Sequence, residues 1–200
     1  ICNSSEGEPC VFKDKFLWEN HPEEVIEGMK IALETMGPNS RGYIYLNKHY
    51  YKNFASRLQK IIGKLPIVLF KKTGGYLAGE ETVLLNDIEG KKLEPRPKPP
   101  YPTEHGLFDS PTLVNNVETF YSIAKIAKDE YRHTRFCSIS GDVEHEGVFE
   151  FPENRTIEQI LKETENLPSF EFFVQTRGGV IGDILSSSEL DRPVGGAGTI

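Results

Sequence analysis

The segment Gly42–Phe70, GYIYLNKHYYKNFASRLQKIIGKLPIVLF, decides the fold class of this chain. It opens with a β-branched and aromatic run, Gly42–Leu46, which predicts a strand. Apolar residues then recur at helical spacing from Tyr50 to Ile62, and a second apolar run, Pro66–Phe70, predicts another strand. Strand, helix and strand in this order, with nearly continuous apolar strands, indicate a parallel sheet covered by helices on both faces.

The alternation continues on both sides of this segment. Upstream, Pro22–Met36 predicts a helix that Gly37 and Pro38 end. Downstream, Glu80–Ile88 predicts a short helix, and Ser110-Pro111 offers the start of another that runs to about Asp129. Between these two, the proline-rich stretch from 95 to 102 is expected to run extended as polyproline II. Residues 1–130 are therefore predicted to form an α/β, Rossmann-like domain with a parallel sheet and flanking helices.

Beyond Tyr131 the pattern changes. A strand and a turn at Gly141 lead to a strand at Gly147–Phe151, a helix from Thr156 to about Glu165 and a strand at Phe170–Gln175, followed by a glycine-rich end. This β-β-α-β order does not continue the earlier alternation. We place a domain boundary near residue 131 and predict that residues 131–200 form a small α+β β-grasp domain, ubiquitin-like and of the soluble-ligand-binding type.

Composition narrows the possible partners. The chain has 200 residues, 38% of them hydrophobic, which is enough for one or two cores, and its net charge of -7 repels nucleic acid. No apolar run approaches the roughly 20 residues of a membrane span, so direct membrane insertion is not expected. The three cysteines, Cys2, Cys10 and Cys137, are too few and too far apart for a disulfide framework or a metal site. These features predict a cytoplasmic protein without a metal or iron–sulfur cluster in these residues.

Three short polar strings could bind a ligand, although each has a simpler explanation. Glu6-Gly7-Glu8-Pro9 could place a ring against a glycine and offer carboxylates to hydroxyl or N–H groups, but it could equally be a solvated acidic turn. Gly79-Glu80-Glu81 stands at a predicted helix start, where acidic residues are favourable without any ligand. The adjacent Asn115 and Asn116 either cap a helix or hold a ligand.

Four strings together resemble a known family. They are Cys2–Pro9 (CNSSEGEP), Gly74–Thr82 (GGYLAGEET), the proline segment and Pro111–Thr119 (PTLVNNVET). In this order and spacing they resemble the NADH- and FMN-binding flavoprotein subunit of respiratory complex I and related subunits of NAD-dependent hydrogenases and formate dehydrogenases. The resemblance runs along nearly the whole chain. The family usually has an aspartate where Ser5 stands and a glycine where Cys10 stands.

The resemblance implies FMN and NADH as ligands and other electron-transfer subunits as partners. It also implies that this chain is the central part of such a subunit, without the N-terminal glycine-rich loop for the FMN phosphate and without the C-terminal domain that carries a [4Fe–4S] cluster. The residues matched to the family's cofactor site are Asn3, Glu6, Glu8, Tyr76, Gly79, Glu80, Glu81, Tyr101, Val114, Asn115, Asn116 and Thr119.

The function expected from this resemblance is hydride transfer from NADH to FMN within an electron-input module, in which no side chain acts as a nucleophile. The alternative is a binding or assembly module, a homologue that keeps the fold and the β-grasp domain but has lost the flavin. A flavin absorbance spectrum distinguishes the two.

Overall fold

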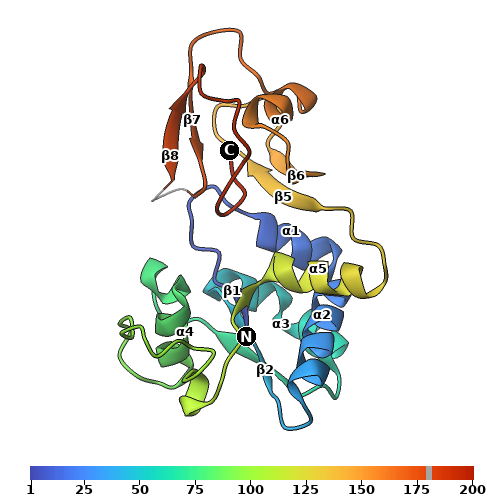
Figure 1. Cartoon of the computed structure of the whole chain (residues 1–200), viewed down its shortest axis with the longest axis vertical. Helices are drawn as coiled ribbons and strands as arrows, with labels where there is room; N and C mark the ends of the chain where they lie inside the picture. Colours follow the sequence, from blue (N-terminus) through green and yellow to red (C-terminus); the bar gives the residue numbers. More distant parts are fainter. Residues whose placement is uncertain (179–181) are drawn as a thin grey trace. The chain divides into compact units, whose positions relative to one another are not determined.

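The computed structural model describes residues 1–178 and 182–200 (Figure 1). Close contacts divide the chain into two compact units. The first unit comprises Ile1–Gly7 and Leu17–Glu130, and the second comprises Glu8–Phe16 and Tyr131–Ile200.

The first unit contains a four-stranded parallel sheet. Its strands are β1 (Cys2–Ser4), β2 (Gly42–Leu46), β3 (Ile67–Lys71) and β4 (Asn115–Asn116), arranged in the order β3-β2-β1-β4. The predicted parallel sheet is confirmed. Strands β2 and β3 are added in sequence on one side of β1. The chain then crosses over, and β4 lies on the other side of β1, so the strand order reverses between β1 and β4.

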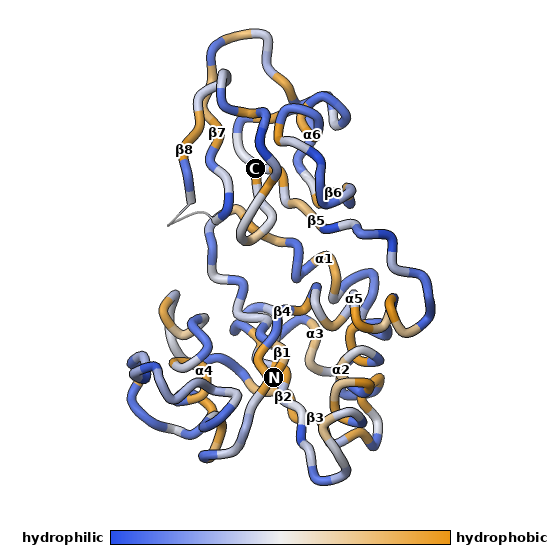
Figure 2. The backbone as a smooth tube through the Cα atoms, in the orientation of Figure 1, coloured by the Kyte–Doolittle hydropathy of each residue, from blue (hydrophilic) through white to orange (hydrophobic). Residues whose placement is uncertain are grey.

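Helices flank this sheet. The helices are α2 (Pro22–Met36), α3 (Lys48–Ile62), α4 (Glu81–Ile88) and α5 (Val117–Ala127). Tyr43 and Tyr45 of β2 pack with Leu84 and Leu85 of α4. Because successive side chains of a strand point to opposite faces, Ile44 and Leu46 face the other side, where α2, α3 and α5 lie (Figure 1). Figure 2 shows hydrophobic residues concentrated in the strands and in the helices around them.

Local signals account for most helix ends. Asn47 caps α3 by accepting a hydrogen bond from the Tyr50 N–H at 2.8 Å, which starts that helix two residues before the predicted position. Pro22 lies in the first turn of α2, as predicted. The sequence patterns did not predict α1 (Lys13–Asn20), whose first residues belong to the second unit and whose last belong to the first.

Two expectations for the first unit were wrong. The helix expected to start at Ser110-Pro111 begins at Val117, because Asn115–Asn116 first pairs with β1 as a strand and Asn116 then caps α5. The short 3-10 helix η2 (Leu107–Asp109) precedes this strand. The proline segment is not an uninterrupted extended stretch, since the chain bends at residues 98–100 and turns at 102–104.

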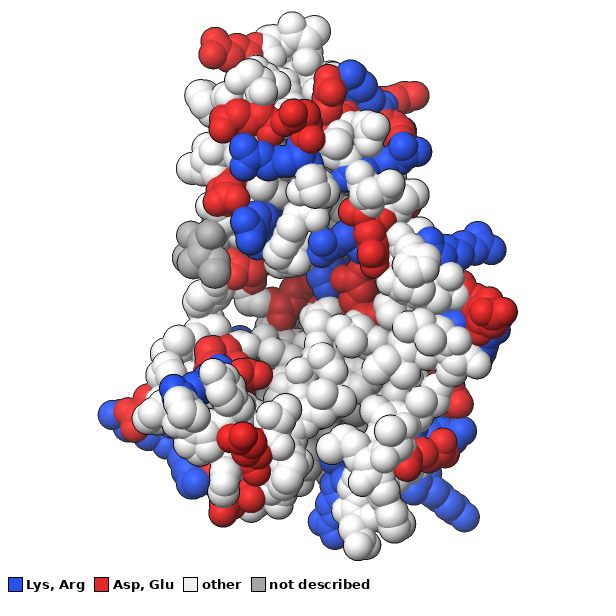
Figure 3. All heavy atoms as spheres, viewed as in Figure 1, with Lys and Arg blue, Asp and Glu red and all other residues white. Residues whose placement is uncertain are grey.

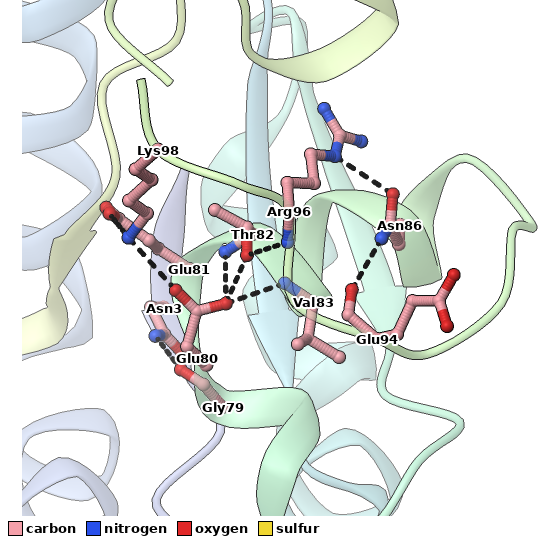
Figure 4. A network of polar contacts seen from close by, with 10 residues as sticks. All are labelled: Asn3, Gly79, Glu80, Glu81, Thr82, Val83, Asn86, Glu94, Arg96 and Lys98. Atoms are coloured by element: carbon pink, nitrogen blue, oxygen red, sulfur yellow. Dashed lines mark hydrogen bonds and ion pairs between the residues drawn. The ribbon is translucent and has the colours of Figure 1, made fainter. Parts of the chain in front are cut away.

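The proline segment is held down by Arg96. The backbone N–H of Arg96 donates to Thr82 Oγ1 at 2.9 Å, and its Nε donates to Asn86 Oδ1 at 2.9 Å (Figure 4). Its guanidinium also donates to the Gly106 carbonyl at 3.0 Å and pairs with Glu89 at 2.9 Å. These contacts tie the segment to the face of α4 that carries Thr82 and Asn86.

The second unit contains two antiparallel pairs of strands and one helix. Strands β5 (Thr134–Ile139) and β6 (Gly147–Pro152) pair with each other, as do β7 (Phe173–Thr176) and β8 (Asp183–Ser186). Helix α6 (Ile157–Glu163) begins with a capping box at Thr156 and Gln159. Strand β8 falls in the stretch expected to be only a glycine-rich end.

The two strand pairs and α6 share one apolar core. Its most buried members are Ile139, Ile157, Cys137 and Leu161. Thr199, near the end of the chain, forms a parallel bridge with Ser138 of β5. The order of hairpin, helix and returning parallel segment is compatible with a β-grasp, and the assignment of two domains with these identities stays a prediction.

Candidate functional site

The carboxyl ends of β1 and β4 lie side by side. Asn3 of β1 is in register with Asn116 of β4, and the Asn116 side-chain amide lies 3.4 Å from the Asn3 carbonyl. In an open parallel sheet, ligands bind outside the carboxyl ends of the strands at the place where the strand order reverses. Here that place is the boundary between β1 and β4, so two of the predicted residues stand at the expected ligand position.

Asn3 also connects the sheet to the short 3-10 helix η1 (Tyr76–Gly79). Its side-chain N–H donates to the Gly79 carbonyl at 2.9 Å, and its Oδ1 accepts the N–H of Ser5 at 3.2 Å (Figure 4). A Cβ on Gly79 would lie 2.7 Å from Ser5 Oγ, so a side chain there would require the Ser5 hydroxyl to rotate away. The bond from Asn3 to Gly79 connects the loop after β1 to the segment that leads into α4.

Glu80 has a structural role. Its carboxylate caps α4 by accepting the N–H groups of Thr82 at 2.8 Å and Val83 at 3.0 Å, and it also accepts the Thr82 hydroxyl (Figure 4). Burial favours a raised pKa for Glu80, but the bonds from Thr82, Val83 and Lys98 outweigh it and hold the pKa below its usual value. The simpler explanation of Glu80 as a helix cap therefore accounts for its position without a ligand.

Lys98 brings a positive charge from the proline segment to this corner. Its Nζ lies 3.1 Å from Glu80 and 2.5 Å from Glu81. The hydrogen bond to Glu81 contributes most to the raised pKa of Lys98. Sequence reasoning did not single out Lys98, and nothing in its local pattern distinguishes it from other lysines.

The loop after β1 carries Glu6, Gly7 and, in the second unit, Glu8. Glu6 accepts a hydrogen bond from the buried phenol of Tyr50 at the start of α3. A Cβ on Gly7 would meet the Tyr76 ring at 3.5 Å and Lys72 Nζ at 3.7 Å. Glu8 belongs to the second unit, where its carboxylate lies beside Gly178.

The remaining predicted residues lie around the same sheet edge or beyond it. Asn115 takes part in β4 through its backbone, and Val114 is partly buried against the core shared by β2 and α4. Thr119 is exposed in the first turn of α5. Tyr101 is 53% exposed and shows no side-chain hydrogen bond within the described chain.

Gly75, in the loop before η1, leaves room for a flat ligand to approach the backbone. A Cβ on Gly75 would meet no atom within 4 Å, and the backbone of Gly75 does not need a positive φ. Neither packing nor conformation therefore requires glycine there. An open backbone beside the Tyr76 ring, which is 46% exposed, fits the approach of a flat aromatic ring.

The helix α5 adds a favourable electrostatic feature. Asn116 accepts the Glu118 N–H at 3.0 Å as its N-cap, so the amino end of this helix lies at the carboxyl edge of the sheet. The positive end of a helix macrodipole attracts anions such as phosphate. Among residues 1–178 and 182–200, no group of His, Cys, Asp and Glu side chains is arranged to hold a metal ion.

A model of the Nuo51 FMN-binding domain matches residues 1–125 of the chain. The chain belongs to this family. It is 32% identical to the NADH-quinone oxidoreductase F subunit of Aquifex aeolicus, covering 100% of this chain and 55% of that protein. With the corresponding NADH-quinone oxidoreductase protein of Escherichia coli it is 32% identical over 97% of this chain and 50% of the relative. The chain thus spans about half the length of these Nuo51-family relatives.

The chain is also similar to a hydrogenase subunit. The NAD-reducing hydrogenase HoxS subunit alpha of Cupriavidus necator is 33% identical, with 80% of this chain and 31% of that protein covered. A crystal structure of NAD+-reducing [NiFe]-hydrogenase in the air-oxidized state superposes with a TM-score of 0.88 and 29% identity, over 99% of this chain and 38% of that one. The Nuo51-type fold of the chain therefore rests on both sequence and structure.

Proposed function

We propose that this chain forms the flavin- and nucleotide-binding part of an NADH dehydrogenase flavoprotein. The observation that carries the proposal is the register pairing of Asn3 with Asn116 at the reversal point of the parallel sheet, within a chain that matches an FMN-binding family. The matched residues Glu6, Tyr76 and Thr119 lie on the loops and the helix that leave this edge.

The residues present fit a flavin nucleotide in three respects. The amino end of α5, with Asn115 and Asn116 directly before the helix and Thr119 in its first turn, would receive an anionic phosphate. The backbone of Gly75 beside Tyr76 would admit a ring. The Glu6 carboxylate and the Asn3 carbonyl would accept N–H or hydroxyl groups.

The chemistry would come from the cofactor. Bound FMN would supply the redox chemistry, which is the transfer of a hydride, two electrons with one proton, from NADH to the flavin with release of NAD+. The protein would orient both ligands, and Glu81 would lie nearer the dinucleotide. We propose that the electrons then pass to other subunits, since the relatives bear the names of subunits of larger enzymes.

The place of action that we propose is the cytoplasm. Cys2, Cys10 and Cys137 are free thiols, and free thiols are typical of reducing compartments. No helix within the described part of the chain has the length and hydropathy needed to span a bilayer. Lysine, arginine, aspartate and glutamate are intermingled on the face drawn in Figure 3.

The second candidate function is a binding or assembly module without a flavin. It is favoured by the polar side chains that are already engaged within the fold: Glu80 caps α4, Asn116 caps α5 and Asn3 holds Gly79. In addition, a cavity of about 480 Å³ in the second unit is lined by Leu161, Phe172 and Val174, among others.

One absorbance experiment separates the two functions. The full-length protein is purified, incubated with FMN and passed through a desalting column, and NADH is then added under nitrogen. The proposed function predicts retained flavin bands that bleach when NADH is added. A colourless protein after this procedure would favour the assembly module.

A further inference from the structure

Lys72 is a buried lysine at the carboxyl edge of the sheet. It directly follows β3, and its backbone N–H donates to the Leu46 carbonyl at 2.8 Å, which extends the pairing of β2 and β3 by one residue. The residue is only 5% exposed. Its position is thus set by the sheet itself, one residue beyond the last strand position.

The charge of Lys72 has little compensation within the fold. Along the part of the chain that the structure describes, its Nζ forms no hydrogen bond or ion pair. Burial lowers the pKa of Lys72, Asp87 partly opposes this change, and Lys48 adds to it. Asp87 is already engaged, because it accepts the Tyr45 hydroxyl, the Thr73 N–H and the Thr73 hydroxyl.

A largely buried lysine without an ion-pair partner loses much of the hydration of its charge, and such a residue at the edge of a candidate site is a candidate for a functional role. The direction of the side chain indicates where a partner would lie. Lys72 Nζ is 3.7 Å from the position of a Cβ on Gly7, and the same position is 3.5 Å from the Tyr76 ring. The ammonium therefore lies against the glycine of the loop after β1, beside an aromatic ring.

We propose that Lys72 meets a negative charge of the bound flavin nucleotide. The proposal rests on the proposed function and adds to it a residue that the matched strings do not contain. Two parts of FMN carry or gain negative charge, namely the phosphate and the ring when it accepts electrons. Both would be stabilised by an ammonium that has no competing partner in the protein.

The test compares Lys72→Met with Lys72→Arg in the full-length protein. Lys71→Met is the matched control, because Lys71 is the preceding residue, carries the same charge and is exposed. Affinities for FMN and for riboflavin, which lacks the phosphate, are measured by calorimetry on the apoprotein, and the midpoint potential of the bound flavin is measured by spectroelectrochemistry. Thermal unfolding of each apoprotein is recorded as well.

The proposal predicts two effects of Lys72→Met. Without flavin, the variant should unfold at a higher temperature than the wild type, because a buried uncompensated charge is removed. In the presence of flavin, one of two results is expected. Either the variant binds FMN roughly tenfold or more weakly while its affinity for riboflavin is unchanged, or the midpoint potential of its bound flavin shifts to more negative values. The first result locates Lys72 at the phosphate and the second at the ring. Lys72→Arg should keep part of the wild-type affinity and potential, and Lys71→Met should match the wild type in both.

Other results would overturn the proposal. If the wild type binds FMN but Lys72→Met leaves both affinities and the potential unchanged, the Lys72 proposal is wrong while the proposed function stands. If the Lys72→Met apoprotein unfolds at a lower temperature than the wild type and its affinities for FMN and riboflavin fall equally, Lys72 has a purely structural role. A wild type that binds no flavin would overturn the proposed function and the Lys72 proposal together.

Discussion

Single side chains at the sheet edge serve the fold and the candidate site at once. Tyr45 is fully buried, and its hydroxyl donates to Asp87, which also anchors Thr73 at the start of the Gly74-Gly75 loop. Burial, followed by the hydrogen bond and the charge of Asp87, raises the pKa of Tyr45. This one tyrosine therefore links the central strand to the loop that carries Tyr76.

The first prediction concerns Tyr45→Phe. At neutral pH the change should destabilise the protein by about 1–3 kcal/mol, because the Asp87 carboxylate loses the hydrogen bond that it accepts from the Tyr45 hydroxyl. Since the folded-state pKa of Tyr45 is raised, its contribution is complete below the unfolded-state pKa of about 10 and is lost as pH rises further. Urea unfolding of both proteins at several pH values between roughly 8 and 11 checks this. A stability difference that does not shrink above pH 10 would contradict it.

The second prediction concerns nucleotide choice. The carboxylates of Glu8 and Glu81 would accept a bond from a ribose 2′-hydroxyl but would repel a 2′-phosphate. NADH should therefore be strongly preferred over NADPH by the complete, flavin-loaded protein. Changing Glu81 or Glu8 to glutamine should narrow this preference by roughly 1–3 kcal/mol if that residue faces the ribose.

The measurement is the ratio of kcat/KM for the two nucleotides. Glu34→Gln, at an exposed position of α2, provides a control carboxylate. Equal use of NADH and NADPH by the wild type, or an unchanged ratio in both the Glu8 and the Glu81 variants, would show that these residues do not select the nucleotide.

At the scale of helices and strands, close backbone contacts and caps set the geometry of the site. α2 and α5 approach so closely that a Cβ on Gly28 of α2 would lie 1.8 Å from the Phe120 carbonyl oxygen of α5. This packing fixes α5, whose amino end is part of the candidate site. α4 is fixed in a different way, through its cap at Glu80.

Gly28→Ala should be strongly destabilising. Helix propensity alone would make alanine more favourable than glycine by about 1 kcal/mol, but the added methyl group would collide with backbone that cannot move aside cheaply. We therefore expect a loss of about 2 kcal/mol or more in unfolding free energy, measured by chemical denaturation. The exposed Glu34→Ala of the same helix should change stability by less than about 0.5 kcal/mol. A neutral or stabilising Gly28→Ala would contradict the close packing of α2 and α5.

Glu80→Ala should weaken α4 by about 1 kcal/mol, the usual effect of removing an N-cap side chain. Because the folded-state pKa of Glu80 is lowered, its contribution is present above the unfolded-state value of about 4.3 and disappears as pH falls through the folded-state value. Glu80→Asp should retain the cap. Unfolding curves of the wild type and both variants at pH 7 and in acid check the prediction. If Glu80→Ala and Glu80→Asp lose the same amount of unfolding free energy at pH 7, the capping role is refuted.

At the scale of the whole molecule, each of the two units has its own core. The second unit includes Glu8–Phe16 in addition to the residues from Tyr131 onward. Within it, the Phe12 N–H donates to Ser138 Oγ at 3.1 Å, Ser140 Oγ donates to the Cys10 carbonyl at 3.1 Å, and the Phe16 ring lies 5.6 Å from that of Phe136.

A fragment of residues 131–200 should fold by itself, because β5 to β8 and α6 enclose one core. A synthetic peptide of residues 8–16 should bind to it and raise its unfolding temperature, while the same peptide with Phe16→Ala should bind more weakly. Amide NMR spectra of the fragment, alone and with each peptide, provide the measurement. Undispersed amide resonances in the fragment alone would rule out an independent second domain.

The sequence alone determined the α/β class, the parallel sheet, α2, α3 and the family. These features follow from apolar periodicity and from contiguous motifs, which are local properties of the chain. Local signals misplaced the start of α5, because Asn115 and Asn116 have no strand pattern of their own and become a strand only by pairing with β1.

Only the tertiary structure decided how the candidate site is assembled. It places β4 beside β1, brings Lys98 to Glu81 and leaves Lys72 buried without an ion-pair partner among the described residues. None of these facts has a sequence signature, because each depends on residues far apart in the chain whose approach is fixed by strand order and packing. Strand order is a property of the folded sheet, and no periodicity within a single segment encodes it.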